Sequence, residues 1–472
     1  MTAVSDNGWR DEIRRWVSTP ASRVHLMGVG GIGMAGVARL LAARGLQVTG
    51  CDGTASRLLD GLVASGIPVG VGHDPAHLDG VDWAIFSPAL QPDHPERLAA
   101  EAQGIPLFRR GQVLPVLTEQ WKTIAVSGTH GKTSTSSMIA HLMRACGEDA
   151  SWCIGGELAP DGSPAGIGTS EWLVVEADES DATLAYYHPE IAVITNIEFD
   201  HMEHYASPET MIDCFRTFAQ QTRGPVVYCE EDAEAKIIGE ALDGISYGFS
   251  AAADFCADAL EIGREGTRFT VQTREGQSAS AFLPLTGRHN VHNALGAIAA
   301  CVAAGVDLEA ACAALKSFAL PRRRFERVAA ARGIQVLADY AHHPSEIRAV
   351  IDAAQQAGAQ RIWAVFQPHR YTRTLALRRD YPPAFDGVAG VILTPVYAAS
   401  ESPMEGGTSQ DLLHGFERHA GALAELAVNL NDAATRVTDR WEPGDWILLI
   451  GAGDIENLGP ILKQQLEGAL ES

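Results

Sequence analysis

Short apolar runs, each followed by polar residues, recur along this chain and constrain its fold more than any other feature. They begin at residues 23, 46, 81, 123, 171, 191, 334, 361, 390 and 445, with helix-like patterns between them. Apolar strands that alternate with helices are typical of parallel sheets covered on both faces. Such sheets bind their ligands beyond the carboxyl ends of the strands, where nearly every polar cluster of this sequence stands. The sequence therefore predicts an α/β enzyme.

The length of 472 residues exceeds what one core accommodates, and a prior of roughly 100–200 residues per domain predicts about three domains. Fresh strands follow breaks near residues 110–120 and 320. We therefore expect domains at 1–115, 116–320 and 321–472. In the middle domain, residues 244–250 and 267–273 are expected to form antiparallel strands at the sheet edge.

Charge and cysteine usage exclude several classes of function. The net charge of −23 argues against general binding to nucleic acids or membrane surfaces, because both are polyanionic. The first twenty residues hold no apolar signal region, so a cytoplasmic protein is expected. Eight cysteines stand singly without a CxxC pair, which favours buried free thiols over disulfides or a zinc knuckle.

The stretch GTHGKT, residues 128–133, follows an apolar run and precedes a helical pattern. Its glycines allow successive N–H groups to face an anion, and Lys132 brings a positive charge to the terminal phosphates. The hydroxyl of Thr133 suits a magnesium ion. Val126 occupies the first glycine position of the strict phosphate-loop pattern, but strand, turn, Lys-Thr and helix all occur in order.

A second turn, GVGGIG, fits the G-x-G-x-x-G pattern through Gly28, Gly30 and Gly33, and Asp52 ends the next expected strand. Alone, this is a weak dinucleotide fingerprint that would suit a dehydrogenase. The same backbone suits any diphosphate, so a protein that already carries an ATP loop can use this turn for a nucleotide-linked substrate instead.

Two polar clusters follow neighbouring strands after the GTHGKT loop. Carboxylates at strand ends are costly unless they are solvated, paired or bound to a cation, so we expect a divalent metal that holds nucleotide phosphates. The first cluster contains Glu176, Asp178, Glu179 and Asp181, and the second contains Asn196, Asp200 and His201.

Two further clusters follow strands in the last domain. They are largely cationic, which suits a small molecule that carries a carboxylate, because arginine binds carboxylates through paired contacts. Their members are Asp339, Tyr340, His342, His343, His369, Arg370 and Arg373.

The chain resembles the Mur ligases of bacterial cell-wall synthesis along nearly its whole length. The motifs that carry the resemblance are, in order, GVGGIGMAGVA, GTHGKTSTSSMI, VVEADESDATL, ITNIEFDHMEHY, GRHNVHNALGAI, RRRFE, DYAHHPSEI, QPHRYTRT and GAGDI. The resemblance implies a Rossmann-like N-terminal domain that binds a UDP-sugar, a central P-loop ATPase domain, and a Rossmann-like C-terminal domain that contacts the amino acid and the nucleotide.

The resemblance also implies roles for individual residues. The UDP-sugar would be bound by Gly28, Gly30, Gly31, Ile32, Gly33, Asp52, His73 and Ser87. ATP would be bound by Gly128, Thr129, His130, Gly131, Lys132, Thr133, Ser134, Asn293, Arg324 and Asp339, and Mg²⁺ by Thr133, Glu176 and His201. The amino acid would be bound by Tyr340, His369, Arg370 and Arg373, with Lys132, Glu176, His201 and His342 as catalytic residues.

The implied reaction joins L-alanine to the lactyl carboxylate of UDP-N-acetylmuramate in peptidoglycan precursor synthesis. ATP first converts the carboxylate to an acyl phosphate, which the amine of alanine then attacks. A histidine is the plausible acceptor for the ammonium proton at neutral pH, and His201 and His342 both remain candidates. A monomer or weak homodimer is expected.

Three segments depart from the family pattern, so the amino acid or peptide that is joined to the sugar, here called the acceptor, stays open. They are FSPALQPDHPE with Pro88 and His94, PVYAASE with Pro395 and Ser400, and PAGIG at 164–168. Serine, glycine or a preformed wall peptide are alternative acceptors, although the peptide-adding relatives lack QPHRYTRT. A dehydrogenase would leave Lys132 and Glu176 without a role, and a regulator with a dead ligase site would be expected to lose them.

Overall fold

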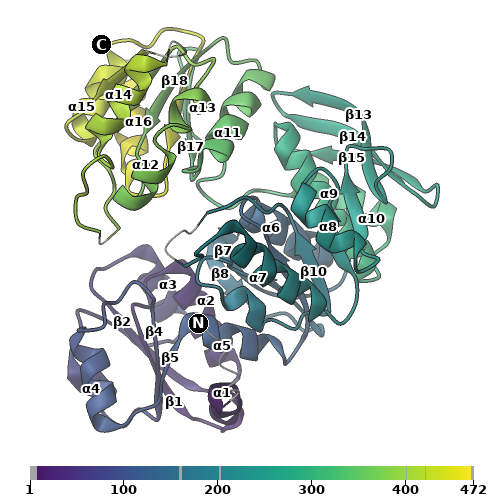
Figure 1. Cartoon of the computed structure of the whole chain (residues 1–472), viewed down its shortest axis with the longest axis vertical. Helices are drawn as coiled ribbons and strands as arrows, with labels where there is room; N and C mark the ends of the chain where they lie inside the picture. The colour runs from purple at the N-terminus through teal and green to yellow at the C-terminus, as the bar shows by residue number, and fades with distance from the viewer. Residues whose placement is uncertain are drawn as a thin grey trace. The chain divides into compact units, whose positions relative to one another are not determined.

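The computed structural model describes residues 8–158, 162–200, 204–399, 401–419, 421 and 423–468. They form two compact units, one from residues up to 259, 269–282 and 292–321, the other from 260–268, 283–291 and 322 onward. The residues so described build three sheets, of 5, 10 and 6 strands, whose arrangement is drawn in Figure 1. Every predicted apolar run contains a strand, which confirms the α/β class. Among the described residues, no helix is both long enough and apolar enough to cross a membrane.

The first sheet has the order β3-β2-β1-β4-β5, and its neighbouring strands run parallel. Helix α5 contacts both α1 and α2 on one face, and α4 with the short turn η1 covers the other (Figure 1). The strands are β1 (Arg23–Met27), β2 (Gln47–Asp52), β3 (Val69–Val71), β4 (Trp83–Phe86) and β5 (Leu107–Arg109). The helices are α1 (Gly8–Ser18), α2 (Ile32–Ala43), α3 (Arg57–Ala64), η1 (Pro75–Leu78), α4 (Pro95–Gln103) and α5 (Arg110–Thr118).

The second sheet has the order β15-β14-β13-β12-β11-β10-β6-β9-β7-β8. Its strands are β6 (Lys122–Ser127), β7 (Ser151–Leu158), β8 (Ser163–Gly166), β9 (Trp172–Glu176), β10 (Ile191–Ile194), β11 (Val226–Cys229), β12 (Ile245–Gly248), β13 (Phe255–Gly263), β14 (Gly266–Thr273) and β15 (Ser278–Leu283). Its helices are α6 (Lys132–Ala145), η2 (Thr183–Tyr186), α7 (Pro208–Gln220), α8 (Ala233–Glu240), α9 (Arg288–Ala303), α10 (Leu308–Ala314) and η3 (Leu315–Ser317).

One expectation for this sheet was wrong. Strand β12, predicted as an antiparallel edge strand, pairs in parallel with both β11 and β13. Helix α8 connects β11 to β12 and packs on β11, and such a crossover helix returns the chain in the same direction.

The third sheet has the order β16-β17-β21-β18-β19-β20, with β16 antiparallel and the other pairs parallel. Separate apolar clusters cover its two faces. The strands are β16 (Glu326–Ala331), β17 (Ile334–Asp339), β18 (Arg361–Phe366), β19 (Gly390–Leu393), β20 (Leu423–Leu426) and β21 (Asp445–Ile450). The helices are α11 (Pro344–Gln356), α12 (Tyr371–Leu377), α13 (Tyr381–Ala384), α14 (Ser409–Arg418), α15 (Leu430–Thr438), η4 (Ile455–Asn457) and α16 (Leu458–Gly468).

Helix α2 connects the first two sheets, because it covers β2 and also packs against β7 and β8. A side chain at Gly36 would place its Cβ 2.8 Å from the Cys153 sulfur, so the close approach of helix and strand requires glycine there. The two sheets therefore share one continuous apolar core.

The cysteines follow the prediction of free thiols. All eight are unpaired by disulfides, and each is buried except the half-buried Cys146.

Candidate active site

The loop of residues 128–131 joins β6 to α6, and its glycines adopt backbone angles that favour this residue type. Gly128 has φ of +135° and Gly131 has φ of +82°. A Cβ at Gly128 would collide with Thr195 Oγ1, and one at Gly131 would lie 2.5 Å from Asn293 Oδ1. The next strand supports the loop, because His130 N donates to Asn196 Oδ1 over 2.9 Å. The sheet thus holds a rigid turn at the N-terminus of α6, where N–H groups attract anions.

Lys132 folds back over this loop. Its Nζ donates to the carbonyl oxygens of Gly128 and Thr129 over 2.6 and 3.1 Å, and to Glu179 Oε1 over 2.8 Å. Burial by itself lowers the pKa of Lys132, but nearby carboxylates, first that of Glu179, outweigh burial and raise it. The loop therefore carries a fixed positive charge.

Thr133 and Glu176 lie beside consecutive glycines of β7. Glu176 ends β9, and one of its oxygens accepts from Gly155 N over 2.8 Å. Thr133, in the first turn of α6, is 5% exposed, and its methyl group would contact a Cβ at Gly156 at 2.8 Å. The structure thus brings a hydroxyl and a carboxylate to the same edge of the second sheet, as predicted from the strand ends.

Arg110 is a site residue that the sequence analysis missed. Its Nη2 lies 3.3 Å from Asp178 Oδ2, and its Nη1 would lie 2.9 Å from a Cβ at Gly33. Burial alone would raise the pKa of Asp178, but the charges of Arg110 and Lys132 lower it to about 2. Arg110 therefore spans from the first glycine turn to the carboxylates beside Lys132. Its only signal was an arginine pair at a predicted domain break.

The first glycine turn, residues 28–33, joins β1 to α2, which begins at Ile32. Gly28 has φ of +77°, and a Cβ there would lie 2.9 Å from that of Ser87. Asp52 Oδ2 accepts from Gly30 N over 2.9 Å. The structure therefore brings Ser87 and Asp52, two residues that the resemblance assigns to the UDP-sugar, to the turn, and Asp52 orients the backbone of the turn.

His73 lies beside β2 and packs among other side chains of the first sheet. Its Nδ1 is 3.0 Å from Glu96 Oε2 and 3.3 Å from Cys51 Sγ, and its Nε2 would lie 3.7 Å from a Cβ at Gly53. The family resemblance assigns His73 to the UDP-sugar site, and it did not indicate these partners.

In the second unit, Asp339 and its neighbours form a charged group at the end of β17. The Asp339 carboxylate accepts from Phe325 N over 2.7 Å and from Ala341 N over 2.8 Å. Burial raises the pKa of Asp339, and the nearby charge of Arg324 opposes this shift. The Arg324 guanidinium lies 5.2 Å from the centre of the Tyr340 ring. Three predicted site residues thus meet here.

A second group in that unit follows β18. The rings of His342 and His369 lie 5.8 Å apart, and Arg373 Nη1 is 3.5 Å from His369 Nδ1. Burial, and then the charges of His342 and Arg373, lower the pKa of His369 to about 3, so this imidazole is neutral at physiological pH. Arg370, with φ of +66°, directly precedes α12 and follows His369 in the chain. The predicted amino-acid site is therefore a cationic group around a neutral histidine.

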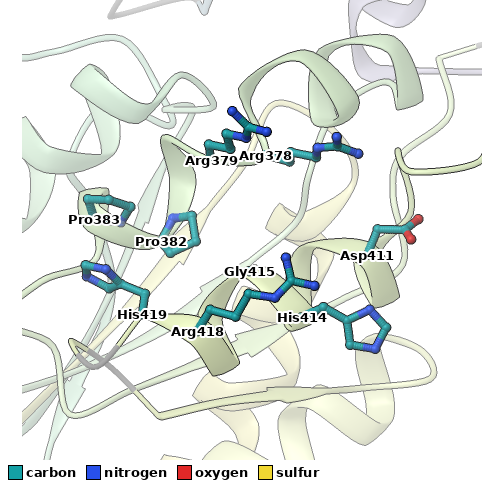
Figure 2. A pocket seen from close by; sticks show the side chains of 9 residues that line it. All are labelled: Arg378, Arg379, Pro382, Pro383, Asp411, His414, Gly415, Arg418 and His419. Atoms are coloured by element: carbon teal, nitrogen blue, oxygen red, sulfur yellow. The ribbon is translucent and has the colours of Figure 1, made fainter.

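The second unit also contains a cavity of about 490 Å³ between the segment after α12, α13 and α14 (Figure 2). Arginine and histidine side chains dominate its lining in the figure, but none of the predicted site residues contributes to it. The lining residues are Arg378, Arg379, Pro382, Pro383, Asp411, His414, Gly415, Arg418 and His419.

Two residues of the expectation, His201 and Ser400, lie outside the described residues. Asn293, which the resemblance assigns to ATP, lies beside Gly131 of the loop after β6. Ser134 follows Thr133 in the buried first turn of α6.

Comparison with known families matches three consecutive parts of the chain. Residues 23–122 match the Mur ligase family catalytic domain, residues 126–301 the Mur ligase middle domain, and residues 323–453 the Mur ligase glutamate ligase domain. Together these matches cover nearly the whole chain and correspond to the three sheets.

Individual relatives agree with these matches. The UDP-N-acetylmuramate–L-alanine ligase of Gloeobacter violaceus is 39% identical over 94% of this chain and 96% of its own length. The enzyme of the same name from Thermosynechococcus vestitus is 40% identical over 94% of this chain and 95% of its own.

Among solved structures, the UDP-N-acetylmuramate-alanine ligase of Thermotoga maritima superposes with a TM-score of 0.81 at 26% identity, over 95% of this chain and 99% of that one. A murein peptide ligase from Psychrobacter arcticus shares the fold, with a TM-score of 0.71 at 24% identity over 94% and 98% of the two chains. With three consecutive domain matches, full-length relatives and a common architecture, this chain belongs to the Mur ligase family.

Proposed function

We propose that this chain is an ADP-forming ligase that joins L-alanine to the lactyl carboxylate of UDP-N-acetylmuramate in peptidoglycan precursor synthesis. The observation that carries the proposal is the loop of residues 128–133, where Lys132 is held between backbone carbonyls and Glu179. Relatives of 39–40% identity that carry this enzyme name support the choice of substrates.

ATP binding is assigned to the loop of the second sheet. Its N–H groups and the N-terminus of α6 suit the phosphates, and Lys132 supplies a charge that increases their electrostatic stabilisation. Asn293 lies against Gly131, so we assign it a contact with the nucleotide at this turn. The roles of His130, Ser134, Arg324 and Asp339 in binding ATP follow from the family resemblance.

The residues at this edge fit a magnesium ion. Mg²⁺ prefers hard oxygen ligands, and both the Thr133 hydroxyl and the Glu176 carboxylate offer oxygen beside β7. We propose that Thr133, Glu176 and His201 hold it. A bound Mg²⁺ would neutralise charge on the phosphates during transfer.

The chemistry requires activation of a carboxylate, because a carboxylate does not react with an amine. An oxygen of the lactyl carboxylate attacks the γ-phosphorus, the bond to ADP breaks, and an acyl phosphate forms. The neutral amine of alanine then attacks the acyl carbon and phosphate leaves. Lys132 stabilises the negative charge in the first step, and the remaining contribution is positioning.

The acceptor is assigned to the group around His369. Arg370 and Arg373 suit the carboxylate of the amino acid, and Tyr340, which follows β17, lies with its ring 5.6 Å from that of His342. His342 and His201 are the candidates for accepting the ammonium proton. His342→Gln separates the two candidates. If this variant still forms the acyl phosphate but no longer supports attack by the amine, His342 is the group that accepts the ammonium proton.

The first glycine turn is assigned to the diphosphate of the UDP-sugar, through residues 28–33, with Asp52, His73 and Ser87 around it. Arg110 reaches from this turn to Asp178, so a substrate bound at the turn has a positive charge between it and the ATP loop. We propose that Arg110 orients the lactyl carboxylate.

We further propose that the domains extend over 1–115, 116–320 and 321–472, with residue 115 inside α5. A cytoplasmic location and a monomer or weak homodimer complete the proposal.

The test is phosphate release from ATP and magnesium with UDP-N-acetylmuramate, offering L-alanine, L-serine, glycine and a wall tripeptide in parallel. Preference for L-alanine supports the proposal. Preference for another acceptor keeps the mechanism and directs attention to Pro395 and Ser400. Absence of turnover with every acceptor would favour a nucleotide-binding regulator.

A further inference from the structure

A cluster of four side chains with metal-binding atoms lies in the first sheet, away from the ATP loop. We call His25, Cys51, His77 and Glu96 the His/Cys/Glu cluster. They come from β1, β2, η1 and α4 respectively, so four separate elements converge on it. One potential ligand atom from each residue lies within 4.8 Å of all the others.

The closest contacts within the cluster are shorter still. His25 Nε2 is 3.3 Å from Cys51 Sγ, and the Cys51 thiol donates to the two Glu96 oxygens over 3.1 and 3.3 Å. His77 Nδ1 lies 2.7 Å from Glu96 Oε1. Four-coordinate zinc places sulfur about 2.3 Å and nitrogen or oxygen about 2.0–2.2 Å from the ion. Tetrahedral ligands at these distances stand about 3.3–3.6 Å apart. The contacts of 2.7–3.3 Å must therefore open, and any pair near the 4.8 Å limit must close, for the four atoms to surround a zinc ion.

Burial distinguishes the cluster from a solvated charge group. His25, Cys51 and Glu96 are 2%, 0% and 0% exposed, and a small apolar cluster with Met27 and Leu78 packs beside them. Two neutral imidazoles, a thiolate and a carboxylate together carry a charge of −2, which a divalent ion cancels. A neutral assembly is the form that a buried site favours.

A neighbouring hydrogen bond presets the orientation of one ligand. Thr49 Oγ1 lies 2.9 Å from His25 Nδ1, directly across the β1–β2 pair. If Nδ1 carries the proton and donates to Thr49, Nε2 is left with its lone pair toward the cluster. Metal-binding histidines commonly make such an outer contact through the second ring nitrogen.

The donor set identifies the class of metal. Sulfur and imidazole nitrogen are ligands of zinc and similar transition metals, whereas Mg²⁺ requires oxygen. His73 stands beside this set, with its Nδ1 3.0 Å from Glu96 Oε2 and 3.3 Å from Cys51 Sγ. Four protein ligands leave no open position for a reacting water, which is typical of a structural site.

We propose that the His/Cys/Glu cluster binds one Zn²⁺ as a closed structural site. On binding, Cys51 forms the Zn–S bond and its thiol proton passes to solvent. The ion ties β1, β2, η1 and α4 together immediately before Asp52, the residue that orients the first glycine turn. It is distinct from the Mg²⁺ assigned to the ATP loop.

A second group, formed by Cys229, Glu231 and His292, provides the internal comparison. It offers three ligands instead of four, and the side chains of Glu231 and His292 are 39% and 22% exposed. This group is therefore the weaker metal site, and Cys229→Ser is the matched control for Cys51→Ser.

The experiment uses the full chain, stripped with a chelator and then titrated with Co²⁺ in excess Mg²⁺. Cobalt in a tetrahedral site with one thiolate gives intense visible absorption and a sulfur-to-metal charge-transfer band. We expect one equivalent to saturate both signals, one equivalent of Zn²⁺ to abolish them, and Zn²⁺ to raise the thermal unfolding midpoint. No thiolate band, or a weak octahedral spectrum alone, would show that the cluster is only a hydrogen-bonded network.

Variants locate the site. Cys51→Ser should lose the charge-transfer band, whereas Cys229→Ser should retain it. His77→Asn changes a ligand whose side chain is 32% exposed, so folding should survive while affinity falls. Thr49→Val should weaken binding about 10- to 100-fold by removing the outer contact. A band that survives Cys51→Ser and disappears in Cys229→Ser would overturn the assignment.

Discussion

The two glycine turns of this protein share a backbone design but differ in the side chains that surround them. Each follows a central parallel strand and begins a helix, and each contains a glycine with positive φ. The turn of residues 28–33 is held by the carboxylate of Asp52 and contains no lysine. The turn of residues 128–131 is followed by Lys132, which lies against Glu179.

This difference shows that the side chains around a shared backbone turn determine its chemical role. The β-strand, turn and helix provide N–H groups that attract an anion in either case. The side chains around each turn then determine its function. At residues 28–33 a single carboxylate orients the backbone, which suits ligand binding. At residues 128–131 a buried cation lies among carboxylates, which suits phosphoryl transfer.

The largest effect is expected from Lys132→Ala. Removing one preorganised charge from a transferring group costs about 10²- to 10³-fold in kcat, roughly 2.7–4 kcal/mol. UDP-sugar affinity, measured by calorimetry without ATP, should not change because that ligand is assigned to the other turn. Lys122→Ala is the control, since Lys122 pairs with Glu171 at the surface. Normal turnover in Lys132→Ala would contradict the difference between the turns.

A substitution to alanine in each turn tests whether the turn of residues 128–131 is more constrained than the turn of residues 28–33. Gly128→Ala should lower the free energy of unfolding by at least about 2 kcal/mol, because it combines a strained backbone with a collision against Thr195. Gly31→Ala is the matched substitution, with its nearest atom 3.8 Å from the Cβ and a negative φ, so it should stay within about 0.5 kcal/mol. Urea denaturation measures both, and equal losses would refute this ranking.

Arg110→Met tests the connection between the turns. Removing the guanidinium leaves Asp178 without this partner and should cost about 1–3 kcal/mol of stability, toward the lower end because the Asp178 side chain is 36% exposed. The KM for UDP-N-acetylmuramate should rise. If Arg110→Met/Asp178→Asn restores stability but not KM, Arg110 acts on the substrate; restoration of both would make it a structural partner only.

The smallest effect is expected from Asp52→Ala. It removes the acceptor of Gly30 N and should cost about 0.5–1.5 kcal/mol. UDP-sugar affinity should fall while the KM for ATP stays constant. Asp60→Ala on the same domain is the control. A change in the KM for ATP of similar size would argue against separate roles for the turns.

Local pattern was sufficient for much of the fold and part of the site. The apolar runs predicted the strands because a strand buried on both faces needs apolar side chains throughout. Lys132 and Thr133 were predicted from the order of strand, glycine turn, Lys-Thr and helix, and Glu176 because a carboxylate at a strand end requires a partner. Their roles stay predictions. The direction of β12 was mispredicted, since no short-range feature records which way a neighbouring strand runs.

Arg110 and the His/Cys/Glu cluster show what pattern alone misses. Arg110 reads as a surface arginine, and its role depends on Gly33 and Asp178 from two other segments. Cys51 was expected to be a buried free thiol, and the sequence analysis did not single out His77.

The sequence by itself determined the class of fold, the two glycine turns and the family, because these depend on local periodicity and on motifs of fixed spacing. Only the tertiary structure decided which distant side chains share a site. Contacts such as Arg110 with Asp178, or His25 with Cys51 and Glu96, join residues through the packing of separate strands and helices, and that packing is a property of the whole chain.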